Sequence, residues 1–304
     1  MPDSYPIFHV SLEPKLDVDP LGDKPKFWFR SPTYNSLWMF KYNTRIPRDY
    51  WSEKIAAEVA ELMGISHPRT ELAVDGNLKG VISESFVHAT SDITSIEFPL
   101  THGNQILQAI IPGYDTKLRF RQRHHTLANI LLALERNISG MCESEEAKRK
   151  FAGYLLLDAI IGNVDRHHTN WGLQRSRTNN QGFVHFLAPS FDHASSLGRD
   201  LNDEVRVNRI RERRVRAYVK RGRGKIYWAE DEHPPPSPLA LAMRALSVFP
   251  SLFEVEVQRL ENLDEDSLHE IVERVPDDWM SLAERKFAIE MMCYSLCQLR
   301  KAIQ

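Results

Sequence analysis

Short apolar segments separated by turn residues, a pattern typical of β-strands, fill most of the first 90 residues. The predicted strands are Lys26–Arg30, Leu37–Tyr42, Thr70–Val74 and Gly80–Phe86. Between the second and third strands, apolar residues recur at three- and four-residue intervals from Arg48 to Met63, which predicts an amphipathic helix that Gly64 ends. The order strand, strand, helix, strand, strand indicates a small mixed lobe.

The middle of the chain shows the longer period of helices. Thr126–Ile138 and Glu145–Ile161 are predicted helices, and Ser144 is the expected N-cap of the second. The end of that helix, YLLLDAII, is apolar nearly all round, which indicates burial in a larger lobe. A strand is predicted at Phe183–Leu187, and a last helix runs from about Met280 to Ala302.

Length and composition agree with a folded protein of two lobes. The chain has 304 residues, of which 42% are hydrophobic and 26% charged, and these values exclude a disordered protein. The net charge of −2 predicts no overall affinity for nucleic acid or anionic lipid. The sequence shows no apolar run of membrane-spanning length and no secretory signal at its start, so we expect a cytoplasmic protein without a membrane partner.

Two polar segments carry candidate chemistry. NVDRHHTN follows the buried helix and places Asp165 five residues before Asn170, while Asp192 lies in LAPSFDHASSLG after the predicted strand. Phosphoryl transfer needs a carboxylate to accept the proton of the attacking hydroxyl and oxygen ligands to hold magnesium on the phosphates. We therefore predict Asp165 as catalytic and Asn170 and Asp192 as magnesium ligands. A polar turn with a capping aspartate is the alternative interpretation.

The same segments resemble the loops GN-x-D-x-H-x-x-N and L-A-P-x-x-D of HipA-like serine/threonine protein kinases. The matching residues are Gly162, Asn163, Asp165, His167, Asn170, Leu187, Ala188, Pro189 and Asp192, with Phe191 in place of the usual tyrosine. The resemblance implies an α+β, bilobal protein-kinase-like fold, with a small mixed α/β N-lobe at residues 1–87 and a larger, mainly helical C-lobe at residues 88–304. It also implies the short form of the family, which lacks the extra amino-terminal subdomain of longer HipA toxins.

The resemblance further implies ATP and Mg²⁺ as cofactors, a protein substrate and an antitoxin-like protein as candidate partner. In the segment LGDKPKFWF, Gly22, Lys24 and Lys26 match the family's phosphate loop, where Lys24 replaces the usual glutamine. The segment from Glu84 to Phe86 is expected to recognise adenine through its backbone groups. An ordinary strand end is the alternative for that segment.

Lys41 lies in the middle of a predicted strand and has apolar neighbours, an uncommon place for a lysine unless the strand is at an edge or the amine has a partner. The resemblance makes Lys41 the ATP lysine and Glu53, in the following helix, its partner. Glu58, about one turn further along, is the competing partner. His167 and His193 flank the candidate active residues, and we interpret them as structural groups that orient the loops.

A basic stretch from Arg206 to Lys225 holds eight arginines and two lysines but a single acidic residue. It is interpreted either as the solvated face of a helix or as a docking surface for an acidic or RNA-bearing substrate. A small-molecule phosphotransferase, a non-catalytic pseudokinase and a protein that only binds RNA are the competing classes of function. A metal hydrolase would use some of the twelve histidines, but the chain has no HExxH motif and no His-Asp dipeptide.

Overall fold

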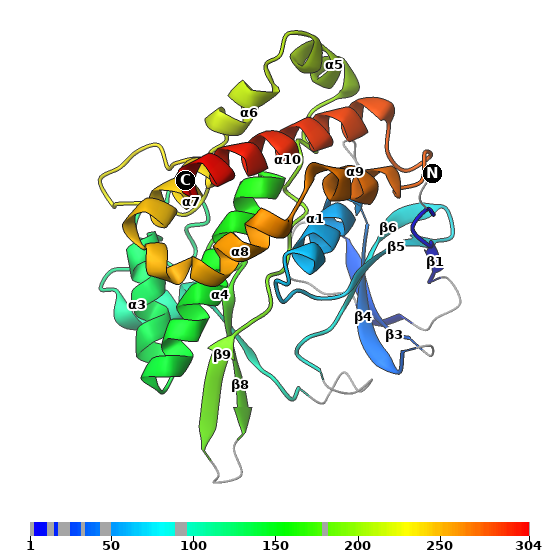
Figure 1. Ribbon diagram of the computed structural model, residues 1–304. Coiled ribbons are helices and arrows are strands. Elements are labelled where there is room, and N and C mark those ends of the chain that lie inside the picture. Colours follow the sequence, from blue (N-terminus) through cyan, green and yellow to red (C-terminus); the bar gives the residue numbers. More distant parts are fainter. Residues whose placement is uncertain are drawn as a thin grey trace.

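The computed structural model describes residues 3–10, 15–17, 25–31, 34–42, 50–88, 96–177 and 182–303 (Figure 1). A six-stranded sheet near the amino terminus has the order β1-β5-β6-β4-β3-β2. Its strands are β1 (Phe8–His9), β2 (Lys15–Asp17), β3 (Lys26–Ser31), β4 (Ser36–Tyr42), β5 (Thr70–Asp75) and β6 (Leu78–Glu84). All neighbours are antiparallel except β1, which pairs in parallel with β5.

The two faces of this sheet have different cores, because successive side chains on a strand point to opposite faces. Leu72 and Val81 belong to the main hydrophobic cluster, which includes helix α1 (Tyr50–Leu62). Their neighbours Ala73 and Ile82 belong to a second cluster with the aromatic side chains of β3 and β4. Helix α1 therefore covers one face of the sheet and connects it to the rest of the molecule.

The remainder of the chain is mainly helical (Figure 1). Its helices are α2 (Gly103–Ile110), α3 (Leu127–Asn137), α4 (Met141–Ile161), α5 (Asp203–Arg211), α6 (Val215–Arg221), α7 (Pro238–Val248), α8 (Glu254–Asn262), α9 (Glu265–Glu273) and α10 (Leu282–Ile303), with a short 3₁₀ turn at Pro250–Leu252. A small antiparallel sheet has the order β7-β8-β9. Its strands are β7 (Leu100–His102), β8 (Gly172–Arg177) and β9 (Phe183–Leu187).

Helix α4 is the centre of the helical part. All residues from Phe151 to Ile161 are buried, and α3, α7, α8 and α10 pack around the helix. This burial agrees with the continuous apolar run at its carboxyl end. Since the loop with Asp165 follows α4 directly, a rigid buried helix fixes where that loop begins.

The start of α4 differs from the prediction. The helix begins at Met141 with Gly140 as its N-cap, one turn before the expected cap at Ser144. Gly140 has a φ of 94°, a conformation that glycine tolerates and other residues rarely adopt. Ser144 instead lies inside the first turn, where its hydroxyl donates to the carbonyl of Met141.

The boundary between the two lobes, expected between residues 87 and 88, remains a prediction.

Within the described residues, no helix combines the length and the apolar composition that crossing a membrane requires.

Candidate active site

The loop of residues 162–170 begins where α4 ends. Gly162 has a φ of 64°, in the left-handed region, and caps the helix. The buried Asn163 then bonds in two directions: its Nδ2 donates to Asp158 Oδ1 at 2.8 Å, and its Oδ1 accepts from the backbone N–H of Asp165 at 3.1 Å. The backbone of Asp165 is thus tied to the buried end of α4.

Asp165 and Asn170 are held together within this loop. The side-chain Nδ2 of Asn170 donates to the backbone carbonyl of Asp165 at 2.9 Å, and the same carbonyl accepts from the N–H of His167 at 2.7 Å. Because its amide nitrogen faces the loop, the side-chain oxygen of Asn170 is the atom left to contact a ligand. The Asp165 carboxylate is half-buried, and Ser195 Oγ donates to its Oδ2 at 3.5 Å.

The second loop, residues 187–198, brings Asp192 toward the sheet. Asp192 Oδ1 lies 3.8 Å from Lys41 Nζ. Asp192 has a φ of 58°, in the left-handed region that is uncommon for a residue with a side chain. Two contacts fix the loop on either side of it, since the N–H of Ser190 donates to the carbonyl of Ser66 and Ser52 Oγ donates to that of Ala194, both at 2.8 Å.

Lys41 contacts the predicted glutamate of α1. Its Nζ lies 3.1 Å from Glu53 Oε1, and both side chains are largely buried. Glu58, the competing choice, instead accepts from Lys54 at 2.6 Å. Lys26 on β3 lies directly opposite Lys41 on β4, so the two lysines extend from the same face of the sheet.

The two flanking histidines are built into the loops, and burial lowers the pKa of both. Burial is the main cause that lowers the pKa of His193, which lies well below its ordinary value, and the positive charge of Arg166 lowers it further. Its Nε2 shares a 2.7 Å hydrogen bond with Ser190 Oγ. Burial also lowers the pKa of His167, although the nearby carboxylates of Asp165 and Asp192 oppose the shift. The two loops meet where the N–H of Val164 donates to the carbonyl of Ser195 at 3.3 Å.

A buried ion pair connects α4 with both loops. Its two residues were not predicted from the sequence. Arg166 contacts Asp158 in bidentate fashion, with Nε to Oδ2 at 2.6 Å and Nη2 to Oδ1 at 2.7 Å. Arg166 also donates to the carbonyl of Asn170 at 3.2 Å and to Ser190 Oγ at 2.9 Å. The sequence held a signal for this pair, because a charged Asp158 inside the apolar run YLLLDAII needs a partner.

Replacing Arg166 by methionine should lower the free energy of unfolding by about 3–5 kcal/mol, because it leaves the Asp158 carboxylate buried without its partner. Urea unfolding of the variant and the unmutated protein measures this difference. The control is the double variant R166M/D158L, in which no charge remains and much of the stability should return. A double variant no more stable than the single one would show that the loss does not come from the unpaired carboxylate.

The segment predicted to read adenine lies at the end of β6. The N–H of Glu84 donates to the carbonyl of Arg69 at 2.9 Å, and Gln174 Nε2 donates to the carbonyl of Phe86 at 2.7 Å. Those two backbone groups are therefore engaged within the protein. The ring of Phe86 lies 5.4 Å from that of Phe191, between centroids, so the segment contacts the loop that carries Asp192. The adenine role stays a prediction for the remaining backbone groups.

Two predicted phosphate-loop residues, Gly22 and Lys24, lie outside the described residues. Within the described ranges, no group of three or more His, Cys, Asp or Glu side chains forms a metal cluster. The oxygens offered by Asn170 and Asp192 nevertheless suit magnesium, which takes one or two protein carboxylates and completes its octahedron with water and phosphate. The donor set therefore fits a magnesium ion shared with a nucleotide.

The basic stretch, interpreted from the sequence as a solvated helix face or a docking surface, is not exposed throughout. It forms two short helices, α5 and α6, and Arg206 at its start is 2% exposed. Arg206 is a structural residue, because its Nη2 donates to the carbonyl of Gly198 at 3.1 Å and its Nη1 lies 2.8 Å from Asp203. A docking surface therefore cannot include Arg206. The arginines further along α5 and α6 are partly or fully exposed.

Comparison with known proteins places these features in context. Residues 13–279 match the HipA-like C-terminal domain family. A stretch of 192 residues is 24% identical to the serine/threonine-protein kinase CtkA of Helicobacter pylori strain J99 and covers 60% of this chain. It covers 53% of CtkA, so the match spans about half the length of that curated relative.

Two solved structures are similar over nearly the whole chain. The crystal structure of a Helicobacter pylori proinflammatory kinase CtkA matches with a TM-score of 0.76 and 18% identity, covering 98% of this chain and 99% of that one. A Shewanella oneidensis MR-1 complex of HipA, HipB and operator DNA contains a chain that matches with a TM-score of 0.57 and 14% identity. The match covers 95% of this chain and 65% of that one. The similarity to CtkA confirms the predicted α+β, kinase-like fold.

Proposed function

The chain belongs to the HipA-like C-terminal domain family, as its two loops predicted, and from this premise we propose that it is an ATP- and magnesium-dependent protein serine/threonine kinase. The observation that carries the proposal is the meeting of two loops and one strand. Ser195 of the second loop donates to Asp165 Oδ2 at 3.5 Å, and Asp192 of the same loop lies 3.8 Å from Lys41. A lysine, two carboxylates and an amide are the groups that phosphoryl transfer requires.

The nucleotide would lie between the six-stranded sheet and the 187–198 loop. Lys41, held by Glu53, would pair with phosphate oxygens, and Lys26 on the same face of the sheet is a second candidate for this role. Fixed positive charge near the phosphates balances the charge that develops during transfer. The segment from Glu84 to Phe86 would contact the adenine of the nucleotide, and Gly22 and Lys24 would contribute to the phosphate loop.

Asp165 would orient the acceptor hydroxyl and take its proton. As the hydroxyl oxygen forms a bond to the γ-phosphorus, the bond from that phosphorus to the β,γ-bridging oxygen breaks and ADP leaves. Magnesium, when bound by Asn170 and Asp192, would neutralise charge on the phosphates. The hydrogen bond between Asn170 Nδ2 and the Asp165 carbonyl supports this division of roles, because it keeps the two side chains in one geometry.

Substrate and partners are proposed from the relatives. CtkA is named a serine/threonine-protein kinase, which supports a hydroxyl acceptor on a protein. The Shewanella HipA was solved with HipB and operator DNA from a toxin–antitoxin system, which supports a toxin-type kinase with an antitoxin-like partner. The presence of Lys41, Asp165, Asn170 and Asp192 argues against a pseudokinase.

The alternative is a small-molecule phosphotransferase, because the same groups would act on any hydroxyl. Incubating the purified chain with γ-labelled ATP, magnesium and a cell extract separates the two. We expect labelled protein bands that yield phosphoserine or phosphothreonine on acid hydrolysis, and no label when a chelator removes magnesium. Label confined to small molecules would favour the alternative, and the absence of any labelled product would contradict both.

A further inference from the structure

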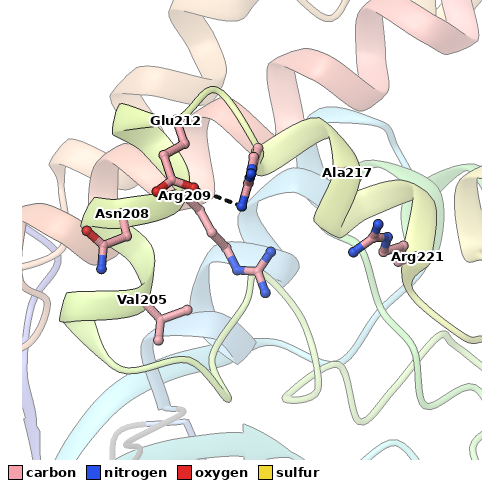
Figure 2. Close-up of a pocket in the computed structure, with 7 residues that line it drawn as sticks. Val205, Asn208, Arg209, Glu212, Ala217 and Arg221 are labelled. Atoms are coloured by element: carbon pink, nitrogen blue, oxygen red, sulfur yellow. Dashed lines mark ion pairs between the residues drawn. The ribbon is translucent and has the colours of Figure 1, made fainter.

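A cavity of about 520 Å³ lies between α5 and α6 (Figure 2). The residues that line it are Val205, Asn208, Arg209, Glu212, Arg214, Ala217 and Arg221. Figure 2 shows the guanidinium groups of Arg209 on α5 and Arg221 on α6 extending toward each other from opposite walls. Three of the seven lining side chains are arginines, and only one is acidic.

The charges of the residues that line this cavity do not balance one another. Arg214 lies 3.0 Å from Glu212, which uses the only carboxylate of the lining. Among the residues that the structure describes, neither Arg209 nor Arg221 has a carboxylate partner. Arg209 Nε is also buried and lacks a hydrogen-bond partner within the same residues. Like charges that face one another are unfavourable, and an anion between them would relieve the repulsion.

The walls of the cavity are held firmly. Arg206 fixes α5 to the carbonyl of Gly198, while on α6 the hydroxyl of Tyr218 donates to Asp200 Oδ1 at 2.7 Å. The ring of Tyr218 packs against that of Phe287 on α10, with centroids 5.4 Å apart. The guanidinium of Arg209 lies 5.3 Å from the Tyr218 ring centroid, which orients it. An anion site formed by these arginines would therefore be largely preformed.

A chain of contacts joins this region to Asp165. Arg206 Nη2 also approaches the carbonyl of Arg199 at 3.4 Å, Arg199 Nη2 donates to Ser195 Oγ at 3.0 Å, and Ser195 Oγ donates to Asp165 Oδ2. The cavity is therefore built on the segment that directly follows the 187–198 loop. A polypeptide whose hydroxyl reaches Asp165 could place a neighbouring side chain in the cavity.

The chemistry favours a phosphorylated side chain as the ligand. A phosphate monoester carries nearly two negative charges and three acceptor oxygens, so it can pair with both guanidinium groups at once, whereas a carboxylate carries one charge. RNA is less suitable, because single strands are bound by stacking bases on exposed aromatic rings. None of the seven lining residues is aromatic, and the nearby Tyr218 of α6 is engaged by Phe287, Asp200 and Arg209.

We propose that the cavity between α5 and α6 binds a phosphoserine or phosphothreonine of the protein substrate, close to the hydroxyl that Asp165 serves. This inference rests on the proposed kinase function. It names a substrate class, namely proteins that already carry a phosphate near the acceptor residue. Arg209 and Arg221 are the residues that would recognise that phosphate.

The test uses the full chain and fluorescent peptide mixtures with phosphothreonine, glutamate or alanine fixed at successive positions around a serine. Binding is measured by anisotropy without nucleotide, so it does not depend on catalysis. We expect the phosphothreonine peptides to bind best to the unmutated protein and about 10- to 100-fold more weakly to R209Q/R221Q. R216Q/K220Q, the control, loses two exposed charges of α6 that do not line the cavity, and its binding should not change.

The outcomes separate the cavity from the chemistry. The inference would be overturned if binding of the phosphothreonine peptides weakened equally in both double variants, or weakened in neither. It would also be overturned if an RNA oligonucleotide bound through Arg209 and Arg221 and the peptides did not. If R209Q/R221Q fails to fold by circular dichroism, the single variant R221Q tests the same point, because Arg221 is exposed. The phosphothreonine peptides are also assayed for transfer of phosphate from ATP to their serine. Failure of that transfer alone would contradict the proposed function and not the phosphate-binding cavity.

Discussion

Replacing Asp165 by alanine should slow phosphate transfer about 10²- to 10⁴-fold and leave the affinity for ATP nearly unchanged. The expected loss follows from the role of a group that orients and deprotonates the acceptor, which matters in the transition state more than in the bound nucleotide. Single-turnover transfer from labelled ATP measures the rate, and calorimetric titration measures the affinity. A loss of transfer rate and of ATP affinity in the same proportion would mean that Asp165 contributes to nucleotide binding and not to phosphate transfer.

The Asp165 result needs a matched carboxylate as its control. Asp231 is exposed and lies outside both loops, so D231A removes the same charge without touching the candidate site. We expect D231A to transfer phosphate at the rate of the unmutated protein. A similar loss in D231A would show that the overall charge, and not the 162–170 loop, determines the rate.

Replacing Asp192 by alanine should abolish the part of ATP-induced stabilisation that depends on magnesium. A ligand that binds only the native state at a hundredfold excess over its Kd adds about 2.7 kcal/mol to the free energy of unfolding. Asp192 is the candidate carboxylate ligand, and its contact with Lys41 at 3.8 Å places it next to the proposed phosphate position. Melting temperatures with ATP, in magnesium and in chelator, measure the effect for the variant and the unmutated protein.

D165A is the comparison for this experiment, because it should keep the full magnesium-dependent shift. An unchanged shift in D192A would mean that the metal is held elsewhere. Asn170 would then be the first residue to replace, since it is the other proposed oxygen ligand.

Local patterns in the sequence predicted most of the elements near the site. The apolar segment around Lys41 predicted β4, and the helical period after it predicted α1. The family resemblance then indicated Glu53 of that helix as the partner of Lys41, and the structure has this contact. Asp165 and Asn170 could be placed on one loop because an apolar helix ends immediately before them. These features depend on interactions between residues close in the sequence or on a single strong motif.

Features that depend on distant residues could not be predicted. Strand β7 pairs with β8, about 70 residues further along, and no local pattern marked that partner. The burial of Arg206 against Gly198 also follows from packing, since it lies in a stretch with eight arginines and nothing local distinguishes it from the exposed ones. The contact between Asp192 and Lys41 joins residues more than 150 positions apart, and only the family resemblance indicated it.

Phosphoproteomics after expression of the intact chain, beside the D165A variant at the same level, tests the central claim most directly. The proposal predicts serine or threonine phosphorylation of one or more cellular proteins in the first sample that is absent from the second. Identical phosphorylation in the two samples, with both proteins folded and abundant, would contradict a protein kinase that acts through Asp165.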